Sequence, residues 1–178
     1  MNRRLSAKEL ATGGLIAAAY VALGVLFAPI SFGMVQVRIA EVLTLLPLFT
    51  PTGVWGVTVG CALTNIYGLS IGANIAGVWD IFLGSAATFL AAWLTYRLRN
   101  AEIAGFPVLA ALPPVLVNAL IVGGELTYVM SPALEPEIFM LNFVSVAAGQ
   151  VVPCLLVGLP LAKYLKKSGI ANRVFVSA

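Results

Sequence analysis

The residues that could bind a ligand are few, and they stand in long apolar stretches. Arg38 and Glu41 are three residues apart, so a helix places them on one face. Asp80 follows an uncharged stretch of 38 residues, from 42 to 79. Glu125 comes seven residues after Asn118, which puts a carboxylate and an amide on one helical stripe. These groups predict hydrogen bonding to a polar ligand.

Several kinds of catalysis are excluded. The chain contains no His, so Ser–His–Asp triads, Cys–His pairs and His-ligated metal sites are impossible. Its two cysteines, Cys61 and Cys154, lie singly in apolar runs and indicate packing rather than a zinc cluster or a disulfide framework. No serine is spaced for a dyad, and no phosphate-binding G-x-x-x-x-G-K-[ST] loop is present. We expect neither an enzyme nor a metal or cofactor. If the protein is a pump, a partner subunit must hydrolyse ATP.

The composition indicates that these groups are held in a lipid bilayer. Of 178 residues, 61% are hydrophobic and 10% are charged, and the mean hydropathy is +1.02. Soluble domains are about 45–50% apolar and about 25% charged. A membrane span needs about 20 apolar residues, so the chain has room for six or seven. We therefore predict an all-α membrane protein with one integral membrane domain, residues 1–178.

Charges and turn residues divide the chain into six predicted transmembrane helices in one compact bundle. The sequence Thr50-Pro51-Thr52-Gly53 is a turn signal that splits the longest uncharged stretch. The second helix would be about 18 Å long, too short to cross a bilayer alone. The fifth helix could start as early as Pro107; we begin it at Pro113 and Pro114, because proline suits a first helical turn. The predicted ranges are 10–28, 38–49, 53–69, 77–97, 113–130 and 138–164.

The basic residues predict the orientation. With six crossings and both termini in the cytoplasm, every Lys and Arg except Arg38 falls on the cytoplasmic side, as the positive-inside rule expects. The sequence pI of about 9.1 therefore requires no nucleic-acid partner. The nine cytoplasmic residues are Arg3, Arg4, Lys8, Arg97, Arg99, Lys163, Lys166, Lys167 and Arg173.

In this topology, five helices place polar side chains in the outer half of the membrane. Each charge at membrane depth costs roughly 2.5–3.5 kcal/mol, so such groups normally face the bundle interior. We predict an outward-opening pocket under the loops 29–36, 68–76 and 131–137. Two structural roles stay open: Arg38 and Glu41 could neutralise each other, and Asp80 could cap a helix. The pocket residues are Arg38, Glu41, Asn65, Asp80, Asn118, Glu125, Asn142 and Gln150.

The first helix carries a repeat of small residues. Gly14, Ala18 and Ala22 recur every four positions. Small residues at this spacing let a second helix approach closely. The partner is either a helix of the same chain or another membrane protein.

Three segments resemble a known family. Residues 32–47, FGMVQVRIAEVLTLLP, are similar to the signature of the QueT family, the queuosine-precursor substrate-binding subunits of energy-coupling-factor (ECF) transporters. Residues 112–126, LPPVLVNALIVGGEL, resemble that family's second block, and residues 80–88, DIFLGSAAT, a third. The resemblance spans nearly the whole chain.

The resemblance implies a six-helix, multi-pass subunit in a prokaryotic cell membrane that binds a 7-deazaguanine base. It also implies three partners, a membrane coupling subunit and two cytoplasmic ATPases. In these transporters an A-x-x-x-A motif of the first helix faces the coupling subunit, and Gly14–Ala18 occupies the matching positions here. The substrate subunit is thought to topple in the membrane and carry its pocket inward.

The expected ligand suggests a role for each side chain. A 7-deazaguanine presents two N–H donors on one edge, which a carboxylate accepts; we assign Glu125 to this edge and Asn118 to the ring carbonyl. Asp80 is a second carboxylate for the edge or for a charged aminomethyl group. The flat ring calls for an aromatic partner. The candidates are Trp79, Tyr67 and Phe32.

Other functions remain open. A stand-alone homo-oligomeric carrier would transport without an ATPase. A substrate subunit for another vitamin or nucleobase would share this organisation. Composition does not distinguish the cyano precursor, the aminomethyl precursor and queuine.

Overall fold

The regular structure of the described residues is helical. The computed structural model describes residues 6–33, 36–103 and 105–176, and Arg3 and Arg4 lie outside them. The elements in chain order are α1 (Ala7–Leu26), α2 (Ala28–Ser31), the 3₁₀-helix η1 (Ile39–Leu48), α3 (Thr52–Ser70), α4 (Val78–Arg97), α5 (Val108–Met130), α6 (Pro136–Val151), the π-helix η2 (Val152–Val157), α7 (Gly158–Lys167) and the π-helix η3 (Asn172–Val176).

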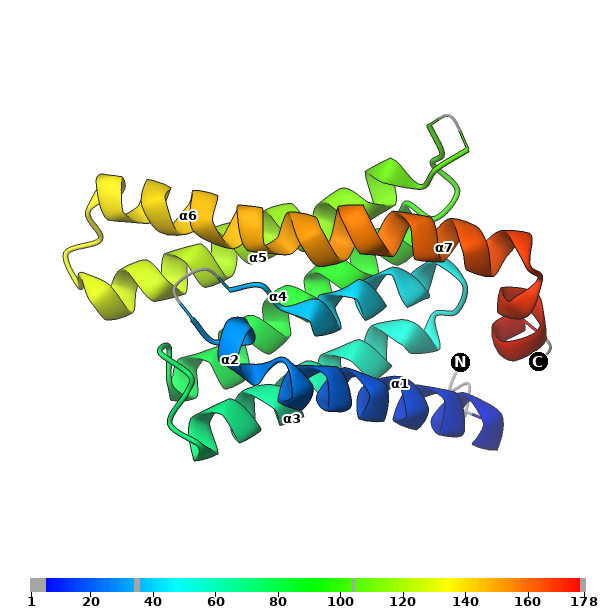
Figure 1. Ribbon diagram of the computed structural model, residues 1–178, viewed down its shortest axis with the longest axis horizontal. Coiled ribbons are helices and arrows are strands. Elements are labelled where there is room, and N and C mark those ends of the chain that lie inside the picture. Colours follow the sequence, from blue (N-terminus) through cyan, green and yellow to red (C-terminus); the bar gives the residue numbers. More distant parts are fainter. Residues whose placement is uncertain (1–5, 34–35, 104, 177–178) are drawn as a thin grey trace, which may run out of the picture.

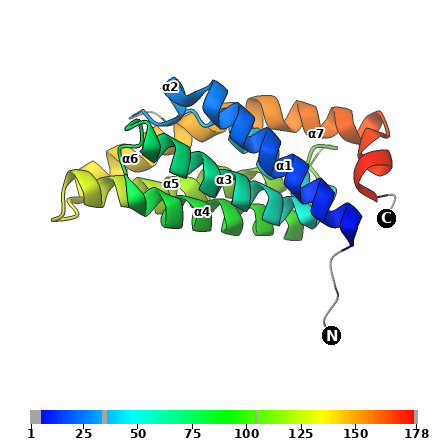
Figure 2. The ribbon, with the colours of Figure 1, turned by 90° about the horizontal axis from the view of Figure 1, so that it is seen from below.

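The long helices form a bundle in which chain neighbours pack together (Figure 1). Contacts run from α1 to α3, from α3 to α4, from α4 to α5 and from α5 to α6, while η1 lies among them and contacts α1, α3, α4 and η2. Both chain ends lie at one end of the bundle, here called the termini end. The connections 71–77 and 131–135 lie at the other, the loop end (Figures 1 and 2). The described basic residues other than Arg38 lie toward the termini end.

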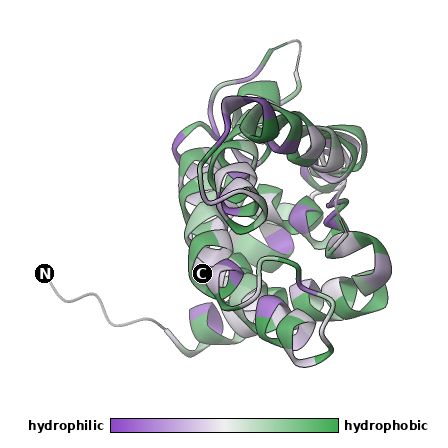
Figure 3. Cartoon of the chain, turned by 90° about the vertical axis from the view of Figure 1, so that its left-hand side faces the viewer, coloured by the Kyte–Doolittle hydropathy of each residue, from purple (hydrophilic) through white to green (hydrophobic). Residues whose placement is uncertain are grey.

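Four described segments are long and apolar enough to cross a membrane: α1, α4, α5 and the continuous stretch Pro136–Lys167. Most residues of the helices are hydrophobic (Figure 3). The 19-residue α3 is not among the four. Its buried face consists largely of glycine, threonine and Asn65, because α3 packs between α1 and α4. The opposite face of α3 carries the exposed hydrophobic residues Trp55, Val59, Leu63 and Ile66.

Helix α1 carries two stripes of small residues. Gly13, Ala17 and Gly24 pack against α3, and the other stripe does not pack within the described chain. Glycines on α3 admit α1: a Cβ at Gly56 would lie 2.9 Å from Ile16 Cβ, and one at Gly60 would lie 2.6 Å from Tyr20 Cβ. The second stripe, Gly14, Ala18 and Ala22, is exposed. A Cβ at Gly14 would meet no atom within 4 Å. The predicted stripe is therefore not used for packing inside this chain.

Helix α1 also begins earlier than the predicted residue 10. Ser6 Oγ accepts a hydrogen bond from the backbone of Glu9, and the Glu9 carboxylate accepts one from the backbone of Ser6. This capping box satisfies two backbone donors that the start of a helix would otherwise leave free.

The predicted short helix 38–49 is present but differs in type. Residues Ile39–Leu48 form a 3₁₀-helix with Arg38 at its N-cap. Pro47 lies inside it and Thr44 Oγ1 donates to Glu41 O at 2.6 Å. At about 2 Å per residue, ten residues span about 20 Å. Because η1 packs against α1, α3 and α4, Arg38 and Glu41 are buried.

The predicted start of α5 at Pro113 is wrong. The helix begins at Val108, so Pro113 and Pro114 lie inside it. Proline has no N–H, and Pro114 therefore leaves Ala110 O without its helical donor. Thr95 Oγ1 of α4 supplies a replacement and donates to Ala110 O at 2.7 Å. A hydroxyl from a neighbouring helix is a known way to satisfy a carbonyl freed by proline in a membrane.

Thr95→Val should therefore destabilise the protein by about 1 kcal/mol, because it leaves a buried carbonyl without a donor. Thr58→Val is the matched control. Thr58 Oγ1 donates to Val54 O at 2.7 Å, but that carbonyl keeps its backbone donor, so we expect a smaller loss. Unfolding in detergent measures both. Equal losses in the two variants would contradict this role of Thr95.

The last predicted helix, 138–164, extends from Pro136 to Lys167 and changes geometry in the middle. Residues Val152–Val157 form a π-helical turn that contains Pro153. Just before it, a Cβ at Gly149 would lie 2.3 Å from Gln36 O. The glycine thus lets the backbone before η1 pass close to α6.

Candidate functional site

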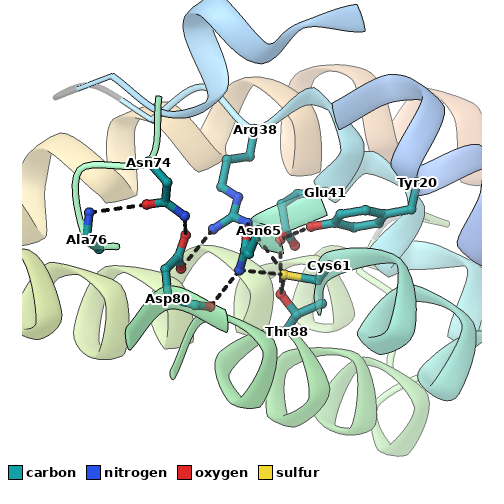
Figure 4. Close-up of polar contacts among 9 residues, drawn as sticks. All are labelled: Tyr20, Arg38, Glu41, Cys61, Asn65, Asn74, Ala76, Asp80 and Thr88. Atoms are coloured by element: carbon teal, nitrogen blue, oxygen red, sulfur yellow. Dashed lines mark hydrogen bonds and ion pairs between the residues drawn. The ribbon is translucent and has the colours of Figure 1, made fainter. Parts of the chain in front are cut away.

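A buried ion pair lies at the centre of the bundle's polar groups (Figure 4). Arg38 Nη1 lies 3.5 Å from Asp80 Oδ1, and both side chains are at most 4% exposed. Arg38 Nη2 donates to Asn65 Oδ1 at 2.5 Å. The ion-pair partner of Arg38 is therefore Asp80 of α4. The hypothesis that Arg38 and Glu41 form an isolated neutralising pair is wrong.

Asp80 serves this cluster and does not cap α4. The N-cap of α4 is Gly77, and Asp80 is the third helical residue. Asn74 Nδ2 donates to Asp80 Oδ2 at 2.8 Å, and Asn65 Nδ2 donates to Asp80 O at 2.6 Å. Gly84 makes room, since a Cβ there would lie 2.0 Å from Asp80 Oδ1. The connection 71–77 is thus tied to the ion pair.

Only one of the two carboxylate oxygens of Glu41 has hydrogen-bond partners. Its Oε1 accepts hydrogen bonds from Tyr20 OH at 2.6 Å and from Thr88 Oγ1 at 3.1 Å (Figure 4). Its Oε2 is buried and has no hydrogen-bond partner. The carboxylate therefore retains one free acceptor inside the bundle.

Helix α5 brings two further polar side chains, and neither is hydrogen-bonded. Glu125 is 4% exposed and Asn118 is 2% exposed. Both carboxylate oxygens of Glu125, and the nitrogen and oxygen of the Asn118 amide, have no partner. A buried polar group without a partner costs about 1–3 kcal/mol, and more if charged. Side chains left in this state are candidates for ligand contacts.

The register of α4 against α5 places these two side chains at the cluster. Thr95 bonds Ala110 across the antiparallel pair. Fifteen residues away from this contact on each helix, Asp80 of α4 lies opposite Glu125 of α5. Between these two levels, Thr88 of α4 lies opposite the part of α5 around Asn118. Asp80 and Arg38 interact electrostatically with Glu125, and Asn118 lies beside the Glu41 carboxylate. Two layers result, one with Glu125, Asp80 and Arg38 and one with Asn118 and Glu41.

The other predicted polar residues are buried too. Gln150 Oε1 is 3.6 Å from Cys154 Sγ, and its Nε2 has no partner. Asn142 Nδ2 donates to Thr127 Oγ1 at 3.1 Å and so joins α6 to α5. Asn142 is therefore engaged in packing between helices, away from the ion pair.

The three predicted aromatic residues lie outside the polar cluster. Trp79 is 57% exposed, and its assignment as a ring partner stays a prediction. Tyr67 is half-buried. Phe32 is buried against α3, where a Cβ at Gly68 would lie 2.4 Å from its ring. Phe32 lines a cavity of about 360 Å³ at the loop end, together with Pro29, Ile71 and Ile75 among others.

The polar cluster is closed to solvent in this structure. Its side chains are each at most 8% exposed. The prediction that polar residues of separate helices come together is confirmed for Arg38, Asn65 and Asp80. A cavity does lie at two of the three predicted loops, 29–36 and 68–76, but its lining contains none of the predicted polar residues.

Sequence reasoning missed several members of the cluster, namely Tyr20, Cys61, Asn74 and Thr88. Asn74 lies in a predicted loop six residues before Asp80, and Tyr20 is a lone polar aromatic in an apolar helix. These two features of the sequence could have indicated that Asn74 and Tyr20 belong to the cluster. Among the described residues, no group of three or more His, Cys, Asp or Glu could hold a metal ion.

Comparison with known proteins gives one result. The family model described as "QueT transporter" matches residues 10–167. Comparisons with curated proteins and with solved structures found no match.

Proposed function

The chain belongs to the QueT transporter family, and on this premise we propose that it is the substrate-binding subunit of an ECF-type importer. It captures a queuosine precursor, a 7-deazaguanine base, outside a prokaryotic cell. A coupling subunit and two ATPase subunits then drive delivery inward. The observation that carries the proposal is the pair of unbonded, buried side chains Glu125 and Asn118 beside the Arg38–Asp80 ion pair.

These groups complement the base. The two free oxygens of Glu125 accept from the ring N–H and the exocyclic amine, and Asn118 donates to the ring carbonyl. The ligand thereby removes the cost of polar groups that are otherwise unsatisfied. The ring face packs on aliphatic side chains or on an aromatic such as Phe32 or Tyr67. Trp79 is not part of this proposal.

Binding to the purified chain tests the proposal. A panel should include 7-deazaguanines, guanine, adenine and unrelated vitamins, with affinity measured by calorimetry. We expect tight binding of the 7-deazaguanines alone. Tight binding of a vitamin instead would favour the alternative of a substrate subunit with another ligand. Uptake by vesicles containing this chain alone would favour a stand-alone homo-oligomeric carrier.

We propose six crossings of the cell membrane with both termini in the cytoplasm. Cysteines introduced at Ala133 and Ile103, both exposed positions in connections at opposite ends of the bundle, test this. The native Cys61 and Cys154 are buried and give a low background. In intact cells an impermeant thiol reagent should label Ala133→Cys and not Ile103→Cys. Labelling of both from outside would contradict this orientation.

The exposed stripe of α1 is the proposed docking surface for the coupling subunit. It borders a groove of about 430 Å³ between α1 and α3, lined by Gly14, Pro51 and Trp55 among others. Nothing in the described chain packs within 4 Å of a Cβ at Gly14. A small-residue stripe that remains exposed suits close contact with a second membrane helix.

Gly14→Leu combined with Ala18→Leu should abolish assembly with the coupling subunit and uptake, because bulk then stands where close approach is needed. Ligand binding by the isolated chain should be unchanged. Ala86→Leu, at an exposed small residue of α4, is the control and should assemble normally. Co-purification with the coupling subunit measures assembly. Normal uptake by the double variant would remove the stripe from the interface.

A further inference from the structure

The buried charges of the described bundle do not balance. Its buried carboxylates are Glu41, Asp80 and Glu125, and its buried cation is Arg38. Arg38 lies 3.5 Å from Asp80 and donates hydrogen bonds to Asn65 and Cys61 at 2.5 and 3.4 Å. Arg38 also attracts Glu41 and Glu125 electrostatically, but its close ion pair is with Asp80. Buried charges are normally paired, because an unpaired one is costly.

Glu125 and Glu41 differ in how many of their carboxylate oxygens lack a hydrogen-bond partner. Glu125 has both oxygens unbonded. This suits a partner with two parallel N–H donors, which the edge of a guanine-type base provides. Glu41 has one oxygen occupied by Tyr20 and Thr88 and only Oε2 free. This suits a single compact donor such as an ammonium group.

Building on the proposed function, we infer that the site selects a 7-deazaguanine whose carbon-7 substituent carries a cationic amine, and that Glu41 binds this amine. Charge-assisted hydrogen bonds are about twice as strong as neutral ones. A nitrile at the same position is a neutral acceptor, and it would meet the free oxygen of Glu41 as acceptor against acceptor. Asn118 lies beside Glu41 and can hold the same end of the ligand.

Three ligands that differ at one substituent test the inference on the wild-type chain. They are the 7-aminomethyl, 7-hydroxymethyl and 7-cyano derivatives of 7-deazaguanine. The hydroxymethyl compound keeps the shape of the aminomethyl one and removes the charge. We expect the amine to bind at least about tenfold more tightly than either neutral compound. Equal binding of all three, or tighter binding of the nitrile, overturns the inference and leaves the proposed function intact. Failure of all three to bind overturns both.

Two variants then locate the amine. Glu41→Gln keeps an amide oxygen for Tyr20 and Thr88 and removes the charge, so the preference for the amine should disappear while the hydroxymethyl compound still binds. That retained binding also shows that the variant is folded. Glu125→Gln should weaken all three ligands by a similar factor and keep the preference. Loss of the preference in Glu125→Gln but not in Glu41→Gln would overturn the assignment to Glu41. If Glu41→Gln does not fold, the wild-type comparison alone decides the selectivity.

Discussion

Replacing Arg38 with glutamine should lower the free energy of unfolding by about 3–5 kcal/mol, because removing one partner of a buried ion pair leaves the other charge uncompensated. The Asp80 side chain is 1% exposed, and Asn74, which donates a hydrogen bond to it, is neutral. The side-chain oxygen of Asn65, Oδ1, also loses the hydrogen bond that Arg38 donates to it at 2.5 Å. Unfolding by sodium dodecyl sulfate in mixed micelles measures the loss.

Two comparisons make this experiment decisive. Adding Asp80→Asn to Arg38→Gln should recover a large part of the stability, because both side chains of the former ion pair are then neutral. Lys166→Gln is the control, since Lys166 pairs with Glu102 in an exposed position. Exposed ion pairs contribute at most about 1 kcal/mol. A similar small loss in Arg38→Gln and Lys166→Gln would contradict the central role of the buried pair.

Glu125→Gln should reduce the affinity for a 7-deazaguanine at least about tenfold, which is about 1.4 kcal/mol. The variant keeps one acceptor and introduces an NH₂ that faces the ligand's own donors. Leaving a ligand donor unpaired costs about 1–3 kcal/mol, and more when its partner was charged. Folding should be preserved, because a neutral side chain is easier to bury and Glu125 has no hydrogen bond to lose.

Glu135→Gln is the control for this measurement. Glu135 is exposed at the N-cap of α6, in the connection between α5 and α6. Calorimetry should show near-normal affinity in the control and a large loss in Glu125→Gln. Near-normal affinity in both variants would exclude Glu125 from the site and leave Asp80 and Glu41 as the carboxylates to examine.

The sequence predicted the helical elements well wherever charge and turn residues mark their ends. It failed at the prolines of α5, because a local rule places proline in the first turn of a helix. What permits Pro114 in the interior is the hydroxyl of Thr95, fifteen residues from the carbonyl it satisfies. The sequence of α5 alone does not indicate this contact with Thr95.

The same contrast holds for the candidate site. Arg38, Asp80 and Glu125 could be found because a charge in an apolar stretch is costly and needs a reason. Tyr20 and Thr88 are neutral and carry no such cost in the sequence. They matter only because the fold brings them to Glu41, from 21 and 47 residues away.

The 3₁₀ geometry of η1 has a consequence for how the length of this segment can vary. With three residues per turn, side chains three positions apart lie directly above one another. Arg38, Glu41, Thr44 and Pro47 keep this spacing, and all four are buried. One residue added to or removed from the segment between Arg38 and Pro47 would rotate the remainder by about 120°. Glu41 would then turn away from Tyr20 or from Arg38. The segment therefore has to keep its length, and the intervening Ala40, Val42 and Leu45 are also buried, which restricts substitution there as well.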